Sequence, residues 1–225
     1  MRMKKGLTEL VFILTRSGST DGLEVDTIGG FNGMIRKRQQ EEGEANVTTV
    51  LFDDQLELVH DRFPLSVVKP LTEEDYYVRG TTALLDAVES TVKKIENVRN
   101  RLPADMKAEK VLVVITTDGM ENASREYTAK MVKQMIERHQ EQGWQFLLLG
   151  ANIDAAEEAE KIGIRRTHAA SYRNDSRGVE LNFHAAGKIM SYMRKACAMS
   201  EEIDEEEMEE EFAECLRSVQ KHLEG

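Results

Sequence analysis

The sequence lacks the cysteines and the long hydrophobic runs that define several classes of protein. Only Cys197 and Cys215 occur in 225 residues, too few for a disulfide framework or a four-cysteine zinc site. No apolar run approaches the roughly 18 residues of a membrane-spanning helix. The basic start of the chain is followed by Thr8 and Glu9, which interrupt the apolar core that a signal peptide needs. We therefore expect a cytoplasmic protein that does not span a membrane.

Basic residues are outnumbered by acidic ones. The chain has 30 lysine and arginine residues against 41 aspartate and glutamate residues, a formal net charge of -11. Residues 201–225 hold eleven acids against Arg217 and Lys221, a net charge of -9, so the other 200 residues carry only -2. Binding of nucleic acid or of an anionic membrane needs clustered lysine and arginine side chains that face phosphates. The charge balance therefore argues against both as the main function.

Three short apolar runs predict the core of a parallel sheet. They span residues 10–14, 111–115 and 146–149, and each is continuous rather than alternating, as in strands that are buried on both faces. Residues 47–61 differ, because Val50 and Phe52 face Leu56 and Leu58 across two aspartates, a pattern that predicts an antiparallel hairpin at one sheet edge. Hydrophobic content of 40% is enough for one large domain.

Helical patterns alternate with these strands. They cover residues 82–101, 124–142 and 154–162, the last with Asp154 as its cap and Gly163 as its stop. Strands that alternate with helices indicate an α/β fold with right-handed crossovers. We expect a doubly wound, mostly parallel sheet of six strands with helices on both faces, a Rossmann-like arrangement, in which the hairpin is the sole antiparallel edge.

The last quarter of the chain predicts helices without strands. Residues 171–225 form a helical C-terminal extension, in which residues 201–214 hold ten acids. Apolar side chains recur there at roughly helical spacing, at Ile203, Met208, Phe212 and Leu216. We expect an amphipathic helix that packs this apolar face on the domain or on a second copy in a homodimer, with its acidic face in solvent. A dedicated partner helix is the alternative interpretation.

Hydroxyl-rich segments follow two predicted strands and precede the long helix. They are residues 15–20, 116–119 and 80–82. In an open parallel sheet, ligands bind outside the carboxyl ends of the strands, where the strand order reverses. Three hydroxyls and one carboxylate that meet there form an oxygen site suited to a hard cation such as Mg²⁺.

Residues 7–167 resemble a von Willebrand factor A (vWA) domain. The metal-ion-dependent adhesion site of that family combines an Asp-x-Ser-x-Ser strand end, a threonine at a helix start and an aspartate at a third strand end; the matching positions are Ser17, Ser19, Thr81 and Asp118. Longer segments are similar to a group of uncharacterised bacterial proteins built around this domain: residues 10–19, 28–34, 79–88 and 116–124. The resemblance covers about two thirds of the chain and implies a vWA-like domain in residues 1–170.

The resemblance implies a metal site and a protein partner. Ser17, Ser19 and Thr81 would be direct ligands of Mg²⁺ or Mn²⁺, while Asp118 and Thr15 would orient bound waters. An acidic side chain of the partner would complete the coordination. The rim of this site would consist of Thr20, Asn152 and residues 73–79.

Thr15 is the main departure from the family pattern. It stands where the family has its leading aspartate, so the site has lost one of its two carboxylates. Losses of groups that act through metal-bound waters cost about 10- to 100-fold in affinity. We therefore expect metal binding to be weak or absent. Asp21 and Glu121 are near enough in sequence to compensate, although Asp21 also fits as the N-cap of the following helix.

Other residues have structural interpretations beside functional ones. Serine and threonine at a strand end often tie down a turn, and Asp118-Gly119 is a common turn dipeptide. Gly29, Gly30 and Gly33 lie inside a predicted helix, which indicates close packing on the sheet rather than a nucleotide loop, since no phosphate-loop motif is present.

The sequence offers little support for catalysis. Ser17 follows a strand, but its setting is not the Gly-x-Ser-x-Gly elbow of a serine hydrolase. The five histidines are widely spaced, and only His168, expected after the sixth strand, would lie near the strand ends. We expect no enzyme. The favoured hypothesis is a protein-binding module with a degenerate adhesion site, the alternative is a metal-independent vWA scaffold that binds through loops or the acidic helix, and a hydrolase or nucleotide-binding protein comes third.

Overall fold

The structure is a computed structural model that describes residues 4–199 and 204–224, with the side chains of all of these except residues 4, 5 and 19. Its centre is a six-stranded sheet in the order β3-β2-β1-β4-β5-β6. The strands are β1 (Lys4–Thr15), β2 (Glu44–Phe52), β3 (Leu56–Pro64), β4 (Ala108–Thr117), β5 (Trp144–Ala151) and β6 (Ala169–Tyr172). All neighbouring pairs are parallel except β2 and β3. The expected α/β sheet is thereby confirmed.

The hairpin also has the register that its sequence predicts. Val50 pairs with Leu58 and Phe52 pairs with Leu56 across the turn. Asp53 closes this turn, because its Oδ1 accepts a hydrogen bond of 2.7 Å from the backbone N–H of Gln55. The hairpin forms one edge of the sheet, next to β1.

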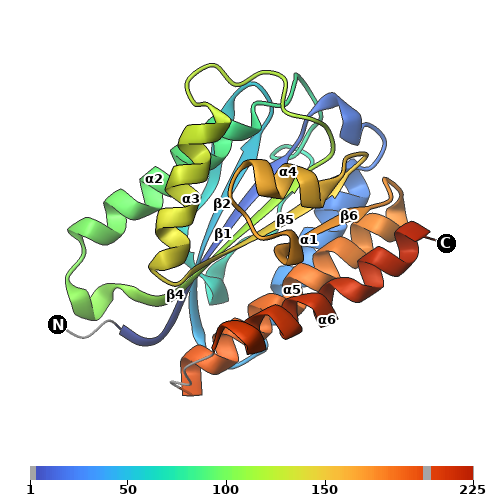
Figure 1. Ribbon diagram of the computed structural model, residues 1–225. Coiled ribbons are helices and arrows are strands. Elements are labelled where there is room, and N and C mark those ends of the chain that lie inside the picture. The colour runs from blue at the N-terminus through green and yellow to red at the C-terminus, as the bar shows by residue number, and fades with distance from the viewer. Residues whose placement is uncertain (1–3, 200–203, 225) are drawn as a thin grey trace.

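Helices cover both faces of the sheet (Figure 1). They are α1 (Glu24–Arg38), α2 (Leu84–Arg101), α3 (Ala129–Glu141), α4 (Ala155–Lys161), α5 (Ser176–Met199) and α6 (Glu205–Glu224), with short 3-10 turns η1 (Gly18–Thr20), η2 (Leu65–Val67), η3 (Ala104–Met106) and η4 (Arg166–His168). One core lies under α1, α5 and α6, and the other lies under α2, α3 and α4.

The central strand β1 explains why its apolar run is continuous. Leu10, Phe12 and Leu14 point into the first core, while Val11 and Ile13 point into the second. All five side chains are fully buried. A strand covered on both faces has no solvent-facing side, so polar residues do not alternate with apolar ones.

The C-terminal helices pack on the sheet rather than extend from it. α6 lies against α5, β6 and η4, and it buries Met208, Phe212 and Leu216 in the core shared with β1. These three residues belong to the predicted apolar face; the fourth, Ile203, lies outside the described residues. In the described part of the chain, no helix combines the length and the apolar character of a bilayer span.

Two predictions about helix starts are wrong. α1 begins at Glu24 after Leu23, and Asp21 is exposed and does not cap it. α3 begins at Ala129 instead of residue 124, because Asp86 of α2 accepts hydrogen bonds from the backbone N–H groups of residues 125–127 and holds them in a loop. Thr128 then caps α3 through Met131.

The predicted packing of the glycines on the sheet is also wrong. A Cβ on Gly30 would lie 2.5 Å from Cδ2 of Phe183, so this glycine packs against α5 and not against a strand. At Gly29 and Gly33 a Cβ would meet nothing within 4 Å. These two glycines therefore lie on the outer surface of α1.

Candidate functional site

A cluster of hydroxyls and one carboxylate lies at the carboxyl ends of β1 and β4, which are neighbours in the sheet. Ser17 Oγ donates to Asp118 Oδ1 at 2.9 Å, and Thr15 Oγ1 donates to the same oxygen at 3.3 Å. The hydroxyls of Thr15 and Ser17 are 3.1 Å apart. All three side chains are buried. The structure thus brings together the predicted residues Thr15, Ser17 and Asp118.

The threonine of the cluster is Thr82 and not the predicted Thr81. Thr82 is buried, and its Oγ1 donates to Ser17 Oγ at 3.1 Å, whereas Thr81 is exposed. Neighbouring residues in extended backbone point in opposite directions, so only one of the two threonines can face the crevice. The sequence carried a usable signal, because Thr82 lies two residues before Leu84, which starts the buried face of α2.

The remaining predicted ligand and the first rim residue lie in η1. The backbone of Ser19 is part of this turn, but its side chain is outside the described part of the structure, so Ser19 stays a prediction. Thr20 is buried, and its hydroxyl donates to the carbonyl of Ser17 at 2.7 Å. Thr20 therefore stabilises the loop that carries Ser17 rather than forming an open rim.

Two further contacts fix the loops of the cluster. Burial raises the pKa of Tyr76 to about 12, so its hydroxyl stays protonated and donates to the carbonyl of Thr15 at 2.7 Å. Asn122, in the loop after Asp118, accepts a hydrogen bond from the Thr82 N–H at 3.0 Å and donates its own N–H to the Thr82 carbonyl. The hydroxyls are thus held by backbone that is itself anchored.

Glu121 does not replace the missing carboxylate. Its Oε2 accepts from the N–H of Leu85 in the first turn of α2, and its Oε1 accepts from the N–H groups of Ala123 and Ser124. These bonds make Glu121 a link between the loop and α2. Asp118 remains the carboxylate that the described part of the crevice presents to its hydroxyls.

An ion-pair network with a buried centre, Arg16 and Asp53, lies beside the cluster on the side of β2. Arg16 is fully buried between the two cluster residues Thr15 and Ser17, and its Nε donates to Asp53 Oδ2 at 2.9 Å. Arg79 donates to the same oxygen at 2.7 Å. Burial raises the pKa of Asp53, but hydrogen bonds from Arg79, Gln55 and Arg16 outweigh it, so the pKa lies below its ordinary value of 3.8.

This network supplies a rigid border to the crevice. The guanidinium groups of Arg16 and Arg79 lie 5.0 and 5.4 Å from the ring centroid of Tyr77, whose side chain is partly exposed. Sequence reasoning placed residues 73–79 at the rim but did not identify the buried Arg16, because a charged residue inside an apolar strand end carries no sign of its partner Asp53.

His168 lies away from the crevice, contrary to expectation. It precedes β6 in η4 and therefore lies near the amino end of that strand, where its ring stacks on Phe212 at 3.9 Å between centroids. Its side chain packs α6 onto the sheet.

The donor set fits a hard cation that binds weakly. Ser17, Thr82 and Asp118 offer the oxygen atoms that Mg²⁺ and Mn²⁺ accept, and Mg²⁺ needs few protein ligands because it keeps several waters. One carboxylate gives less charge than such sites usually hold. Within the described residues, no group of three or more histidine, cysteine, aspartate or glutamate side chains could hold a metal.

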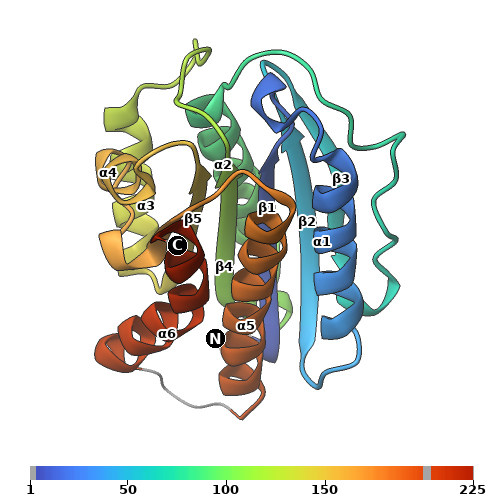
Figure 2. The ribbon, with the colours of Figure 1, turned by 90° about the vertical axis from the view of Figure 1, so that its right-hand side faces the viewer.

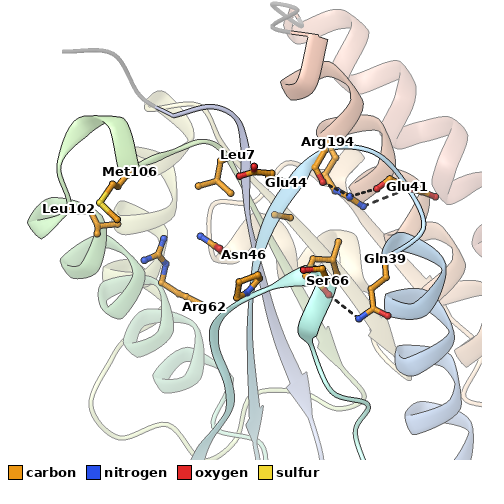
Figure 3. Close-up of a pocket in the computed structure, with 14 residues that line it drawn as sticks. Leu7, Gln39, Glu41, Glu44, Asn46, Arg62, Ser66, Leu102, Met106 and Arg194 are labelled. Atoms are coloured by element: carbon orange, nitrogen blue, oxygen red, sulfur yellow. Dashed lines mark hydrogen bonds and ion pairs between the residues drawn. The ribbon is translucent and has the colours of Figure 1, made fainter.

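A hollow of about 590 Å³ lies at the opposite end of the sheet from the crevice (Figure 3). Arg62 and Arg194 are among the residues that line it. Arg62 donates to the buried Glu9 through Nε and Nη2, and Arg194 donates to the carbonyls of Arg38, Glu41 and Gly43. Both cations are thus engaged in holding strands and helices together.

Comparisons with known proteins agree with the topology. Neither a protein-family model nor a curated protein sequence matches the chain. Among solved structures is proximal thread matrix protein 1 from the mussel byssus, with a zinc-occupied metal-ion-dependent adhesion site (MIDAS) motif. It is 13% identical, with a TM-score of 0.55 over 88% of this chain and 47% of that chain. Manganese-loaded TRAP protein of Plasmodium vivax is 17% identical, with a TM-score of 0.51 over 75% and 69%.

A vWA-type protein from Catenulispora acidiphila is 13% identical, with a TM-score of 0.51 over 88% of this chain and 43% of that chain. The chain spans about half the length of the mussel protein. Identities this low establish a shared fold and no more. The chain has the α/β fold of von Willebrand factor A domains.

Proposed function

We propose that the chain is a protein-binding module whose recognition surface is the crevice at the carboxyl ends of β1 and β4. The observation that carries this proposal is the convergence of the Thr15 and Ser17 hydroxyls on Asp118, with the Thr82 hydroxyl bonded to Ser17. The site lies where open parallel sheets bind their ligands. The vWA fold also supports a protein-binding function, because the position of this crevice resembles that of the metal-ion-dependent adhesion site.

The proposed ligand of the crevice is a weakly held divalent cation, Mg²⁺ or Mn²⁺. Ser17 and Thr82 would hold it directly, Asp118 and Thr15 would orient its waters, and Ser19 stays a predicted third ligand. The bound ion would supply a positive charge that an acidic side chain of the partner completes. Two proteins of the same fold are described as zinc-occupied and manganese-loaded, which supports a divalent ion here.

A metal-independent scaffold is the second candidate, and one observation favours it. Thr82 donates to Ser17, which donates to Asp118, so the hydroxyls form a continuous hydrogen-bonded chain within the protein. Such a chain is stable without a cation, because each buried hydroxyl has a partner. In this case the partner would bind through the loops or through the acidic α6.

We propose no catalytic role. A serine nucleophile requires a base within hydrogen-bonding reach. His60, His139 and His168 are buried in other parts of the fold, where they contact Thr49, the carbonyl of Met135 and the ring of Phe212, respectively. This placement supports a binding function.

Calorimetric titration with Mn²⁺ tests the cation site. The wild type should bind Mn²⁺ weakly, and Asp118→Asn should lose binding because it removes the carboxylate charge while keeping the size of the side chain. Asp21→Asn is a matched control. Asp21 is exposed in the loop that follows η1, so this substitution removes the same charge outside the crevice. Equal affinity of the wild type and Asp118→Asn would exclude the cation site and favour the metal-independent scaffold.

A further inference from the structure

Three helices form a continuous layer over one face of the sheet, with α5 between α1 and α6 (Figure 2). α1 and α5 run in the same direction. Ser176 at the start of α5 bonds to Asp26 at the start of α1, and Arg194 near the end of α5 donates to the carbonyl of Arg38 at the end of α1. α6 runs the opposite way, because His222 near its end contacts Asp175, directly before α5.

Charge is divided between the ends of this layer. α1 has acids in its first turn and Arg36, Lys37 and Arg38 in its last turn. α6 has three glutamates in its first turn and Lys221 and His222 in its last turn. Because α6 is antiparallel to α1, the basic end of α1 and the acidic end of α6 lie at the same end of the layer, and the acidic end of α1 lies level with the basic end of α6.

A groove lies between α1 and the central helix α5. Two hollows lie along it, one of about 210 Å³ that includes Gly29, Gly33 and His184 and one of about 450 Å³ that includes Ser191 and Lys195. The two glycines have open space above them, so another helix could approach the backbone of α1 closely. Lys37, Arg38 and Lys195 line these hollows together with Glu41, Glu42 and Glu180, and Arg38 is paired with Glu41. Burial lowers the pKa of His184, and Lys188, Lys37 and Arg38 lower it further while Glu180 opposes them, so basic groups predominate around His184.

We propose that this layer is the interface of a homodimer, in which α6 of each copy lies in the groove between α1 and α5 of the other copy. A two-fold axis parallel to α5 produces this arrangement, because it exchanges the two sides of the layer and keeps its ends level. The acidic half of α6 then faces Lys37 and Lys188 of the second copy. The contact is isologous and closes at two copies.

Apolar contacts and area agree with this arrangement. Val25 at the start of α1 is 73% exposed and Leu223 at the end of α6 is 42% exposed, and both lie at the end of the layer where the two copies would bring them together. Three helices with axes about 9 Å apart and roughly 30 Å long offer on the order of 600 Å² per copy. A standard stable interface buries about 800 Å² per partner, and the range begins at about 600 Å² per partner, so this area is at the low end of that range.

Charge reversal tests the interface, measured by sedimentation equilibrium at about 100 µM protein, where micromolar dimers are populated. The wild type should have the mass of a dimer. Lys37→Glu with Lys188→Glu should raise the dissociation constant roughly tenfold or more, because like charges would then face each other. Glu210→Lys with Glu214→Lys should do the same. All four substituted side chains are exposed, so folding should be unaffected.

The combined fourfold variant should regain the dimer, because it restores opposite charges across the interface with their signs exchanged. Lys130→Glu with Lys133→Glu on α3 is the matched control; it changes the net charge equally on the other face of the sheet and should leave the dimer intact. A monomeric wild type would overturn the proposal. Unchanged dissociation constants in the two double variants, or a fourfold variant as dissociated as they are, would overturn it as well.

Discussion

At the scale of single residues, the crevice depends on which hydroxyls point inward. Thr15, Ser17 and Thr82 reach the same small volume, because β1 ends beside β4 and Asn122 holds Thr82 by its backbone. Thr15 is the residue that weakens the site, since it supplies a hydroxyl where a carboxylate would supply charge. The charge of the adjacent Arg16 is balanced by Asp53. Arg16 therefore stabilises the loop through a contact within the protein and needs no bound ligand for this.

The two adjacent threonines allow a matched test of the residue assignment. Thr82→Val removes the buried hydroxyl with little change in shape, and it should weaken Mn²⁺ binding about tenfold or more, as the loss of a group that orients or ligates a metal usually does. Thr81→Val should leave the affinity unchanged, because Thr81 is exposed. Calorimetry of both variants decides the question; if Thr81→Val is the weaker binder, the ligand is Thr81.

At the scale of elements, strands and amphipathic helices were the most predictable from the sequence. The run of residues 10–14 predicted a strand buried on both faces, and Val50 and Phe52 predicted the register of the hairpin. Helix starts were less predictable, because tertiary contacts decide them: residues 125–127 have helical character but bond to Asp86 of another helix. Thr82 was missed although it lies two residues before Leu84, because the backbone bonds to Asn122 that fix its direction are not visible in the sequence.

The packing of α6 on η4 makes stability depend on pH. Burial lowers the pKa of His168 to about 4, an effect that Glu209 opposes. Because the folded pKa lies below the ordinary value of 6.5, the unfolded chain binds the proton more tightly. The stability that the neutral ring contributes is therefore complete above pH 6.5 and is lost as the pH falls toward 4.

Unfolding in guanidinium at pH 7.5 and pH 5 measures this dependence. His168 should account for a loss of roughly 2 kcal/mol in the free energy of unfolding between the two values. His168→Phe keeps a ring on Phe212 and should remove the loss of stability that His168 causes. His60 and His139, whose pKa values are also lowered by burial, should still contribute their own losses in the variant. Equal losses in the wild type and the variant would show that His168 does not titrate in this range.

At the scale of the whole molecule, the sheet separates three surfaces. The crevice lies at the carboxyl ends of β1 and β4, the hollow beside Arg62 lies at the other end, and the layer of α1, α5 and α6 covers one face. A dimer through that layer would leave both crevices open, because they lie at the carboxyl ends of the central strands and not on the face of the sheet. Each copy could then bind its own partner.

The central claim is that the crevice is a cation site weakened by Thr15, and Thr15→Asp tests it most directly. The introduced carboxylate would lie beside Asp118, whose Oδ1 is 3.3 Å from Thr15 Oγ1, and two anionic groups lower the free energy of a bound dication. Without metal the same variant should be less stable, because the two carboxylates repel each other. In calorimetric titration Thr15→Asp should bind Mn²⁺ about 10- to 100-fold more tightly than the wild type. An affinity no higher than that of the wild type would contradict the account.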